Sequence, residues 1–92
     1  MTQDETDKLV ELGDAAEMLL DTEVFSKTVN DLVDASFQQF SNSKPEEVDV
    51  RERSYHHYRA LVEIVSTLQQ RVAVRDQINA QTIDDNNQKG DE

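Results

Sequence analysis

The side chains best suited to catalysis or ligand binding lie together in the stretch EEVDVRERSYHHYRAL, residues 46–61. It contains the adjacent histidines His56 and His57, two tyrosines and three arginines. Such residues suit a metal ion, but neighbouring helical residues point about 100° apart, and ligands on one helix need a spacing of three or four. The two histidines therefore do not predict a metal site, and no cofactor is expected.

Acid–base catalysis is a second use of this stretch, and it requires a base, a partner group and a pocket that shifts their pKa values. Carboxylates are plentiful, with 20 Asp and Glu residues in 92. The two glycines, Gly13 and Gly90, cannot form a phosphate-binding loop, and the chain has no cysteine for a thiol nucleophile or a thiolate metal site. No catalytic residue is predicted, and we expect no enzyme activity.

Nucleic-acid binding is a third use, because every arginine lies within residues 51–75. This segment carries a charge of +3, between acidic segments of −10 (residues 1–50) and −4 (residues 76–92). The net charge of −11 repels phosphate backbones and anionic lipid, so independent binding to DNA or membranes is disfavoured. The sequence leaves open whether the arginines pair with carboxylates of the same assembly or contact nucleic acid.

Three amphipathic helices are predicted to carry these residues, at about 7–20, 23–41 and 47–77, because apolar residues recur at three- and four-residue spacing. Thr6 or Asp7 can cap the first helix, and Gly13 inside it leaves room for another helix to approach closely. Ser43 with Glu46, or Asp49 with Glu52, fits a capping box at the start of the third helix. The third helix carries a continuous apolar stripe, which comprises Tyr55, Tyr58, Leu61, Val62, Val65, Leu68 and Val72. A charged flank lies beside it and comprises Arg53, His57, Arg71 and Arg75.

The predicted fold is all-α: an antiparallel helical hairpin with a short additional N-terminal helix and a long third helix, in a single domain over residues 1–78. Residues 79–92 contain one clear apolar residue, Ile83, and are predicted to form a disordered acidic tail. The second helix is roughly 25 Å long and the third roughly 40 Å. A hairpin therefore leaves the stripe uncovered from Val65 to Val72, and either the first helix or a second subunit must cover it.

The expected location is the cytoplasm. The first residues, MTQDETDKL, lack the basic region and the apolar run of a signal peptide. No apolar stretch approaches the roughly 20 residues that span a bilayer. The absence of cysteine is in keeping with a reducing compartment.

Three segments, FSKTVNDLV, SNSKPEEVDVRE and YHHYRALVEIVSTLQQRV, carry a resemblance over roughly residues 20–72. The order of these segments resembles small, largely uncharacterised helical-hairpin proteins of tailed bacteriophages, often encoded near genes for the portal and for DNA packaging. The residues that carry it are Phe25, Pro45, Glu47, Arg51, Glu52, Tyr55, Leu61 and Leu68. The resemblance implies an accessory protein of head assembly or packaging, which works through protein contacts in the host cytoplasm or in the virion.

The sequence therefore favours a non-enzymatic protein-interaction or assembly protein. It would form a homo-oligomer through its amphipathic helices or dock on a larger assembly, with the apolar stripe and the charged flank as its contact surfaces. The alternative is an acidic regulator, or DNA mimic, that blocks a basic nucleic-acid-binding surface of another protein. The sequence specifies neither the partner nor the number of subunits.

Overall fold

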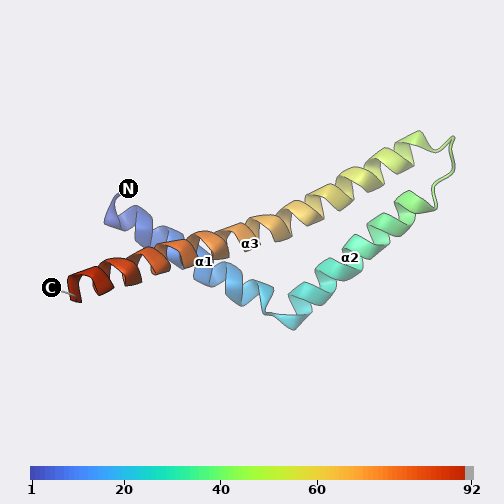
Figure 1. The fold of residues 1–92 in the computed structure, drawn as a ribbon. Helices are drawn as coiled ribbons and strands as arrows, with labels where there is room; N and C mark the ends of the chain where they lie inside the picture. Colours follow the sequence, from blue (N-terminus) through green and yellow to red (C-terminus); the bar gives the residue numbers. More distant parts are fainter. Residues whose placement is uncertain (91–92) are drawn as a thin grey trace. The chain divides into compact units, whose positions relative to one another are not determined.

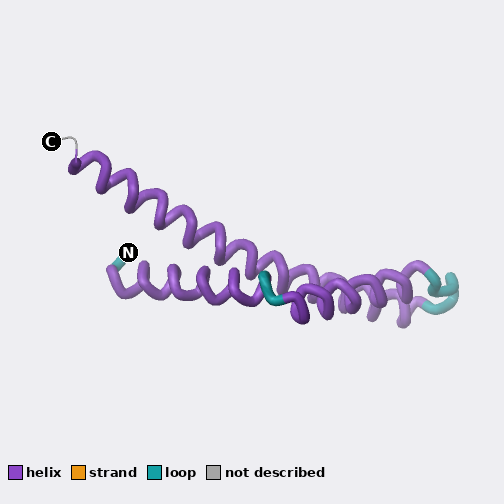
Figure 2. The backbone as a smooth tube through the Cα atoms, turned by 90° about the horizontal axis from the view of Figure 1, so that it is seen from below, coloured by secondary structure: helices purple, strands orange, loops and turns teal. Residues whose placement is uncertain are grey.

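The computed structural model describes the backbone of residues 1–90 and the side chains of residues 1–83. Three helices follow one another along the described chain: α1 (Gln3–Leu20), α2 (Glu23–Ser41) and α3 (Val48–Gly90) (Figure 1). Short loops join them, and the described residues contain no strand (Figure 2). The all-α prediction with a long third helix is confirmed.

The first helix begins at Gln3, before the predicted start at residue 7. Thr2 fixes this start, because its hydroxyl accepts a hydrogen bond from the backbone N–H of Glu5 at 3.2 Å. Asp4 and Glu5 also place negative charge at the positive end of the helix dipole. The capping residue is therefore Thr2, and the prediction of Thr6 or Asp7 is corrected.

A tight turn joins α2, whose bounds match the prediction, to α3. The Lys44 N–H donates to Oε1 of Glu47 at 3.0 Å, and the Glu47 N–H donates to the Lys44 carbonyl at 2.9 Å. The Ser43 hydroxyl donates to the Phe40 carbonyl at 2.7 Å. Lys44 and Glu47 thus close the turn in place of the two predicted capping boxes.

The third helix continues through Gly90, beyond its predicted end at residue 77. The predicted disordered tail, residues 79–92, is therefore helical where its backbone is described, and residues 91–92 lie outside the described residues. Residues 78–89 contain no proline or glycine, so nothing local interrupts the helix. Ile78, which directly precedes the predicted tail, is half-buried in a groove shared with α1.

The helices contact one another in two compact units. The hairpin unit, residues 20–67, pairs α2 with the first part of α3. The ring centroids of Phe37 and Tyr58 lie 6.5 Å apart, and those of Phe40 and Tyr55 lie 6.3 Å apart. Contacts thus move back along α3 as they advance along α2, so the two helices are antiparallel and the predicted hairpin is confirmed (Figure 1).

The terminal unit pairs α1 with the part of α3 that follows residue 67. Arg75 contacts Glu17 near the end of α1, whereas Thr82 shares a groove with Gln3 near its start, so these helices are also antiparallel. The sequence offered α1 or a second subunit as the cover for this part of α3, and α1 lies there. The single domain over residues 1–78 stays a prediction.

Small side chains occupy the buried positions of both units. Ala16 in α1 is 3% exposed and Ser54 in α3 is 2% exposed, and Gly13, Val29 and Ser36 are also buried. No large side chain of the described residues is fully buried. The helices therefore pack by close approach of small residues, and most of the larger apolar side chains are left at the surface.

Candidate interaction surface

The predicted apolar stripe of α3 divides between the two units. Tyr55 is the most open member, with 48% of its surface exposed. The half-buried members of the hairpin unit are Tyr58, Leu61, Val62 and Val65. Leu68 and Val72 are half-buried in the terminal unit. The stripe is thus mainly a packing face, and it opens to solvent at Tyr55.

The predicted charged flank also divides. Arg53 and His57 are exposed in the hairpin unit, and Arg71 is exposed in the terminal unit. Arg75, also in the terminal unit, keeps only 12% of its side chain exposed. The four residues therefore belong to two different units, and Arg75 is set apart by its burial.

Arg75 is the centre of a carboxylate cluster. Its Nη1 contacts Oδ1 of Asp14 at 2.9 Å and also Oε2 of Glu17, while Nη2 lies 2.9 Å from Oδ1 of Asp76. Hydrogen bonds to Glu17, Asp76 and Asp14 raise the pKa of Arg75 above its ordinary value. Every ion pair among residues 1–83 involves this guanidinium. Arg75 therefore joins α3 to α1, which is the charge pairing within the protein that the sequence offered as one use of its arginines.

Gly13 marks the closest approach of α1 and α3. A Cβ atom at this position would collide with the Cβ of Arg75 and would lie 2.8 Å from the backbone carbonyl oxygen of Arg71. The two helices are thus in contact through their backbones here. Because Asp14 follows Gly13 directly, this close approach also brings the Asp14 carboxylate within reach of Arg75.

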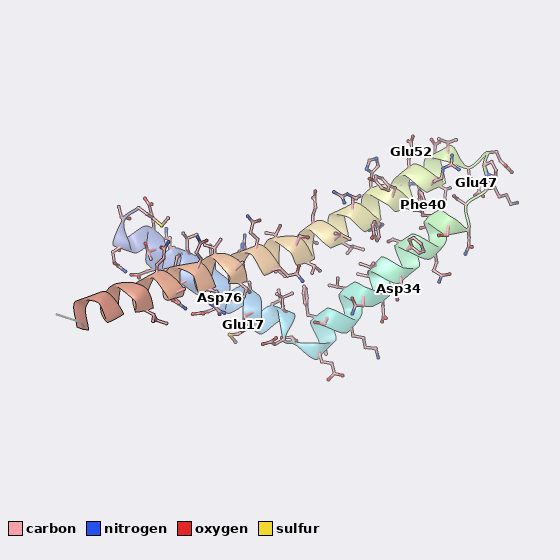
Figure 3. All side chains as sticks on the ribbon, in the orientation of Figure 1. Glu17, Asp34, Phe40, Glu47, Glu52 and Asp76 are labelled. Carbon is pink, nitrogen blue, oxygen red and sulfur yellow. The ribbon has the colours of Figure 1, made fainter. Side chains whose placement is uncertain are left out.

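Four aromatic side chains on the hairpin unit form an apolar depression, which we call the aromatic groove. Phe37 and Phe40 of α2 and Tyr55 and Tyr58 of α3 line a space of about 200 Å³. Phe37 is 56% exposed, Phe40 37% and Tyr55 48%, and Figure 3 shows Phe40 close to the turn that joins α2 to α3. Sites for cofactors and drug-sized ligands typically measure about 300–1,000 Å³. The groove is the right size for one or two apolar side chains of a protein.

A second, more polar depression adjoins the aromatic groove. It shares Phe40 and Tyr55 and adds Arg51, Glu52 and His56. The Tyr55 and His56 rings meet edge to face, with centroids 5.8 Å apart. Charges of both signs therefore border the aromatic groove on its α3 side.

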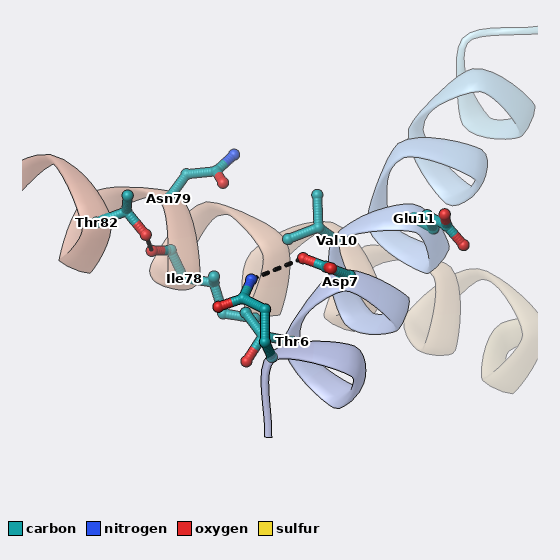
Figure 4. A pocket seen from close by; sticks show the side chains of 8 residues that line it. Thr6, Asp7, Val10, Glu11, Ile78, Asn79 and Thr82 are labelled. Carbon is teal, nitrogen blue, oxygen red and sulfur yellow. Dashed lines mark hydrogen bonds between the residues drawn. The ribbon is translucent and has the colours of Figure 1, made fainter. Parts of the chain in front are cut away.

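A polar depression lies between α1 and α3 in the terminal unit (Figure 4). Asp7, Glu11 and Asn79 are among its lining residues, and Val10 and Ile78 supply its apolar part. The Gln3 side-chain amide donates to Oδ1 of Asp7 at 2.9 Å, so one of these carboxylates is already engaged. The depression is open and mixed in character, and it lacks the converging polar groups of a binding site.

Sequence reasoning did not identify Phe37 and Phe40 as surface residues, but it included Tyr55 and Tyr58 in the apolar stripe that it named as a contact surface. The signal that indicates the groove is the short turn between residues 41 and 48, since such a turn places residues on its two sides opposite each other. Four of the five aromatic residues of the chain flank this turn. Their exposure depends on how closely the helices approach, which hydropathy patterns do not reveal.

The described residues contain no group of three or more His, Cys, Asp or Glu side chains that could hold a metal ion. In the described part of the chain, no helix is both long enough and apolar enough to span a membrane. Comparisons with models of protein families, with curated proteins and with solved structures found no match to this chain.

Proposed function

We propose that this chain is a non-enzymatic interaction or assembly protein that self-associates through its amphipathic helices. The observation that carries the proposal is the imbalance between buried and exposed apolar side chains among the described residues. The only buried apolar side chains there are those of Ala16 and Val29. The exposed large ones are Met1, Leu12, Met18, Leu19, Val24, Leu32, Phe37, Phe40, Val48, Tyr55, Ile64 and Ile83.

This imbalance favours association for an energetic reason. Full burial of one large apolar side chain contributes about 1.5–3 kcal/mol, and a small domain has a net stability of only about 5–15 kcal/mol. A 92-residue chain without a large buried side chain in its described part gains little from its own core. A second subunit that covers several exposed side chains supplies the missing burial.

Sedimentation equilibrium at protein concentrations of about 1–100 μM tests the proposal. This range detects self-association with dissociation constants in the micromolar range. We expect a mass above that of the 10.5 kDa monomer that rises with concentration, and a melting temperature that rises in parallel. A monomer mass at every concentration, with a melting temperature independent of concentration, would contradict self-association.

The resemblance to phage helical-hairpin proteins supports a narrower form of the proposal, an accessory role in head assembly or DNA packaging. The support is the segment order over roughly residues 20–72, and the expected location is the host cytoplasm or the virion. Mass spectrometry of proteins that co-purify from the native source tests this role. Portal or packaging proteins in stoichiometric amounts are expected, and their absence from every preparation would contradict it.

The acidic regulator is a second candidate, and exposed carboxylates on α1 favour it. Asp4, Asp7 and Glu11 recur at three- and four-residue spacing and are all exposed, so one face of α1 is acidic. A regulator of this kind would displace duplex DNA from a basic DNA-binding domain, which fluorescence anisotropy measures. No displacement by a large molar excess at low salt, where charge attraction is strongest, would eliminate this candidate.

A further inference from the structure

We infer that the aromatic groove is the centre of the self-contact, and that its occupant is the same groove of a second copy of this chain. The inference rests on the proposed self-association and adds its place and symmetry. Phe37, Phe40, Tyr55 and Tyr58 would meet the same residues of the second copy around a twofold axis.

The shape and lining of the groove indicate a protein partner. Its space of about 200 Å³ is lined by aromatic rings from two helices, so it accepts apolar side chains, and the only polar side-chain groups of its lining residues are the hydroxyls of Tyr55 and Tyr58. Aromatic residues are enriched at the energetically important centres of protein interfaces. Rings that meet at a tilt within the groove, at 52° for Phe37 with Tyr58, leave edges and faces on which further rings can pack.

Charge disfavours a strongly basic partner. Arg51 borders the groove, and residues 51–59 together contain three arginines and one acidic residue. A strongly basic partner would therefore meet mainly like charge beside the groove.

The border is also self-complementary. Arg51 and Glu52 line the depression that adjoins the groove, so charges of both signs lie side by side there. In a twofold contact the same patch serves both subunits, and residue pairs form reciprocally. Arg51 of each copy therefore faces Glu52 of the other, which gives the border two equivalent charge pairs.

The exposed area predicts a weak dimer. The exposed fractions of Phe37, Phe40 and Tyr55 correspond to roughly 300 Å² if each ring buries about 150–250 Å². A standard interface buries about 800 Å² per partner, so the groove supplies the centre of the contact and less than half its area. We therefore expect a dissociation constant in the micromolar range, where the sedimentation experiment is sensitive.

Two pairs of serine variants test the location. Phe37→Ser and Leu32→Ser change residues of α2 that are 56% and 48% exposed, and Tyr55→Ser and Ile64→Ser change residues of α3 that are 48% and 49% exposed. Each pair removes an exposed apolar side chain from one helix without altering the charge, but only Phe37 and Tyr55 line the groove. We expect the groove variants to raise the dissociation constant about tenfold or more and the control variants about threefold or less. Circular dichroism verifies that each variant remains helical.

A charge exchange tests the second copy and its symmetry. Arg51→Glu alone, or Glu52→Arg alone, places like charges at both border contacts of a homodimer. A mixture of the two variants restores opposite charges at both contacts. We expect each single variant to dimerise more weakly than the wild type, and the mixture to form heterodimers preferentially, as native mass spectrometry measures.

Engineered cysteines give a covalent readout, because the chain has no cysteine of its own. Glu52 and Glu63 are both exposed on α3 and lie 11 residues apart, which places them on nearly the same helix face about 16 Å from each other. With the twofold axis at the groove, Glu52→Cys should form a disulfide-linked dimer under mild oxidation, whereas Glu63→Cys should not.

The outcomes separate this inference from the proposed function. If the wild type associates but the serine variants of Phe37 and Tyr55 bind as tightly as it does, self-association stands and the groove contact is wrong. If the wild type is monomeric throughout, both fail. Weaker binding by all four serine variants equally would also refute the groove as the centre, because Leu32 and Ile64 lie outside it.

Discussion

Replacement of Gly13 by alanine has two opposing effects on the stability of the protein. Alanine inside a helix is favoured over glycine by about 1 kcal/mol, so an isolated α1 would gain stability. In the structure, however, the added Cβ would collide with the Cβ of Arg75 and lie 2.8 Å from the carbonyl oxygen of Arg71. Both obstacles belong to the backbone or its first side-chain atom, so rotation of a side chain does not relieve them.

The clash requires α1 to move away from α3 by about 0.5 Å or more, since ordinary carbon–oxygen contacts lie near 3.4 Å. A gap of 0.5–1 Å removes a quarter to a half of the dispersion energy of the contacts involved, and Ala16, one turn along, loses its close packing. Overpacking typically costs about 1–3 kcal/mol. After subtraction of the helix-propensity gain, Gly13→Ala should destabilise the protein by about 1 kcal/mol, or lower its melting temperature by about 5 °C.

Thermal unfolding followed by circular dichroism at one fixed protein concentration measures this balance, because association changes the apparent stability. Ala15→Gly is the matched control, since residue 15 is exposed in the same helix and reports propensity without a clash. It should destabilise by about 1 kcal/mol. A Gly13→Ala variant that is more stable than the wild type by about the same amount would show that α1 and α3 do not approach closely at this position.

Two further substitutions test the other local contacts. Arg75→Gln should lower the melting temperature more in low salt than in high salt, because it leaves the carboxylates of Asp14 and Glu17 without their partner. The control, Arg53→Gln, changes an exposed arginine and should have little effect on the melting temperature. The raised pKa of Arg75 means that its stabilising contribution is present below the ordinary arginine pKa and is lost only above it, so this effect should not vary between pH 5 and 9. Glu47→Ala should destabilise the hairpin by about 0.5–2 kcal/mol, because it removes the hydrogen bond that Glu47 accepts from the Lys44 N–H. The control, Glu46→Ala, should leave the stability unchanged. Equal effects of the two variants would contradict the capping role of Glu47.

The sequence predicted the helices well because their signals are local. Apolar spacing identifies each helix, and the single proline with its polar neighbours places the turn between α2 and α3. The ends were less accurate for a physical reason. Thr2 caps α1 well before Leu9, where its apolar pattern begins, and the segment after residue 77 is helical although it is largely polar. Capping bonds and contacts with a distant segment are not visible in apolar periodicity.

The surface was harder to predict than the fold, because it depends on how closely the helices approach. Tyr55 belongs to the apolar stripe that the sequence named as a contact surface, and the structure leaves it 48% exposed, whereas Phe40, which is 37% exposed, was not named. The charged flank is divided between the two units. Helical spacing correctly describes one face of α3, but Arg53 and Arg75 lie in different units.

Both units follow one packing rule that links their small residues to their side-chain contacts. Gly13 and Ala16 are buried, and each is followed directly by the carboxylate that reaches Arg75. In the hairpin unit the buried serines at 36 and 54 are likewise followed by the exposed aromatics at 37 and 55. One residue advances about 100° around a helix, so a small residue at the contact line turns its neighbour to the edge of that line. Close approach at the small residue then brings the neighbour within reach of the facing helix. In the terminal unit this neighbour is acidic and joins α1 to α3. In the hairpin unit this neighbour is aromatic and remains partly exposed. The small residues at which α2 and α3 pack therefore also place the aromatic rings that form the aromatic groove.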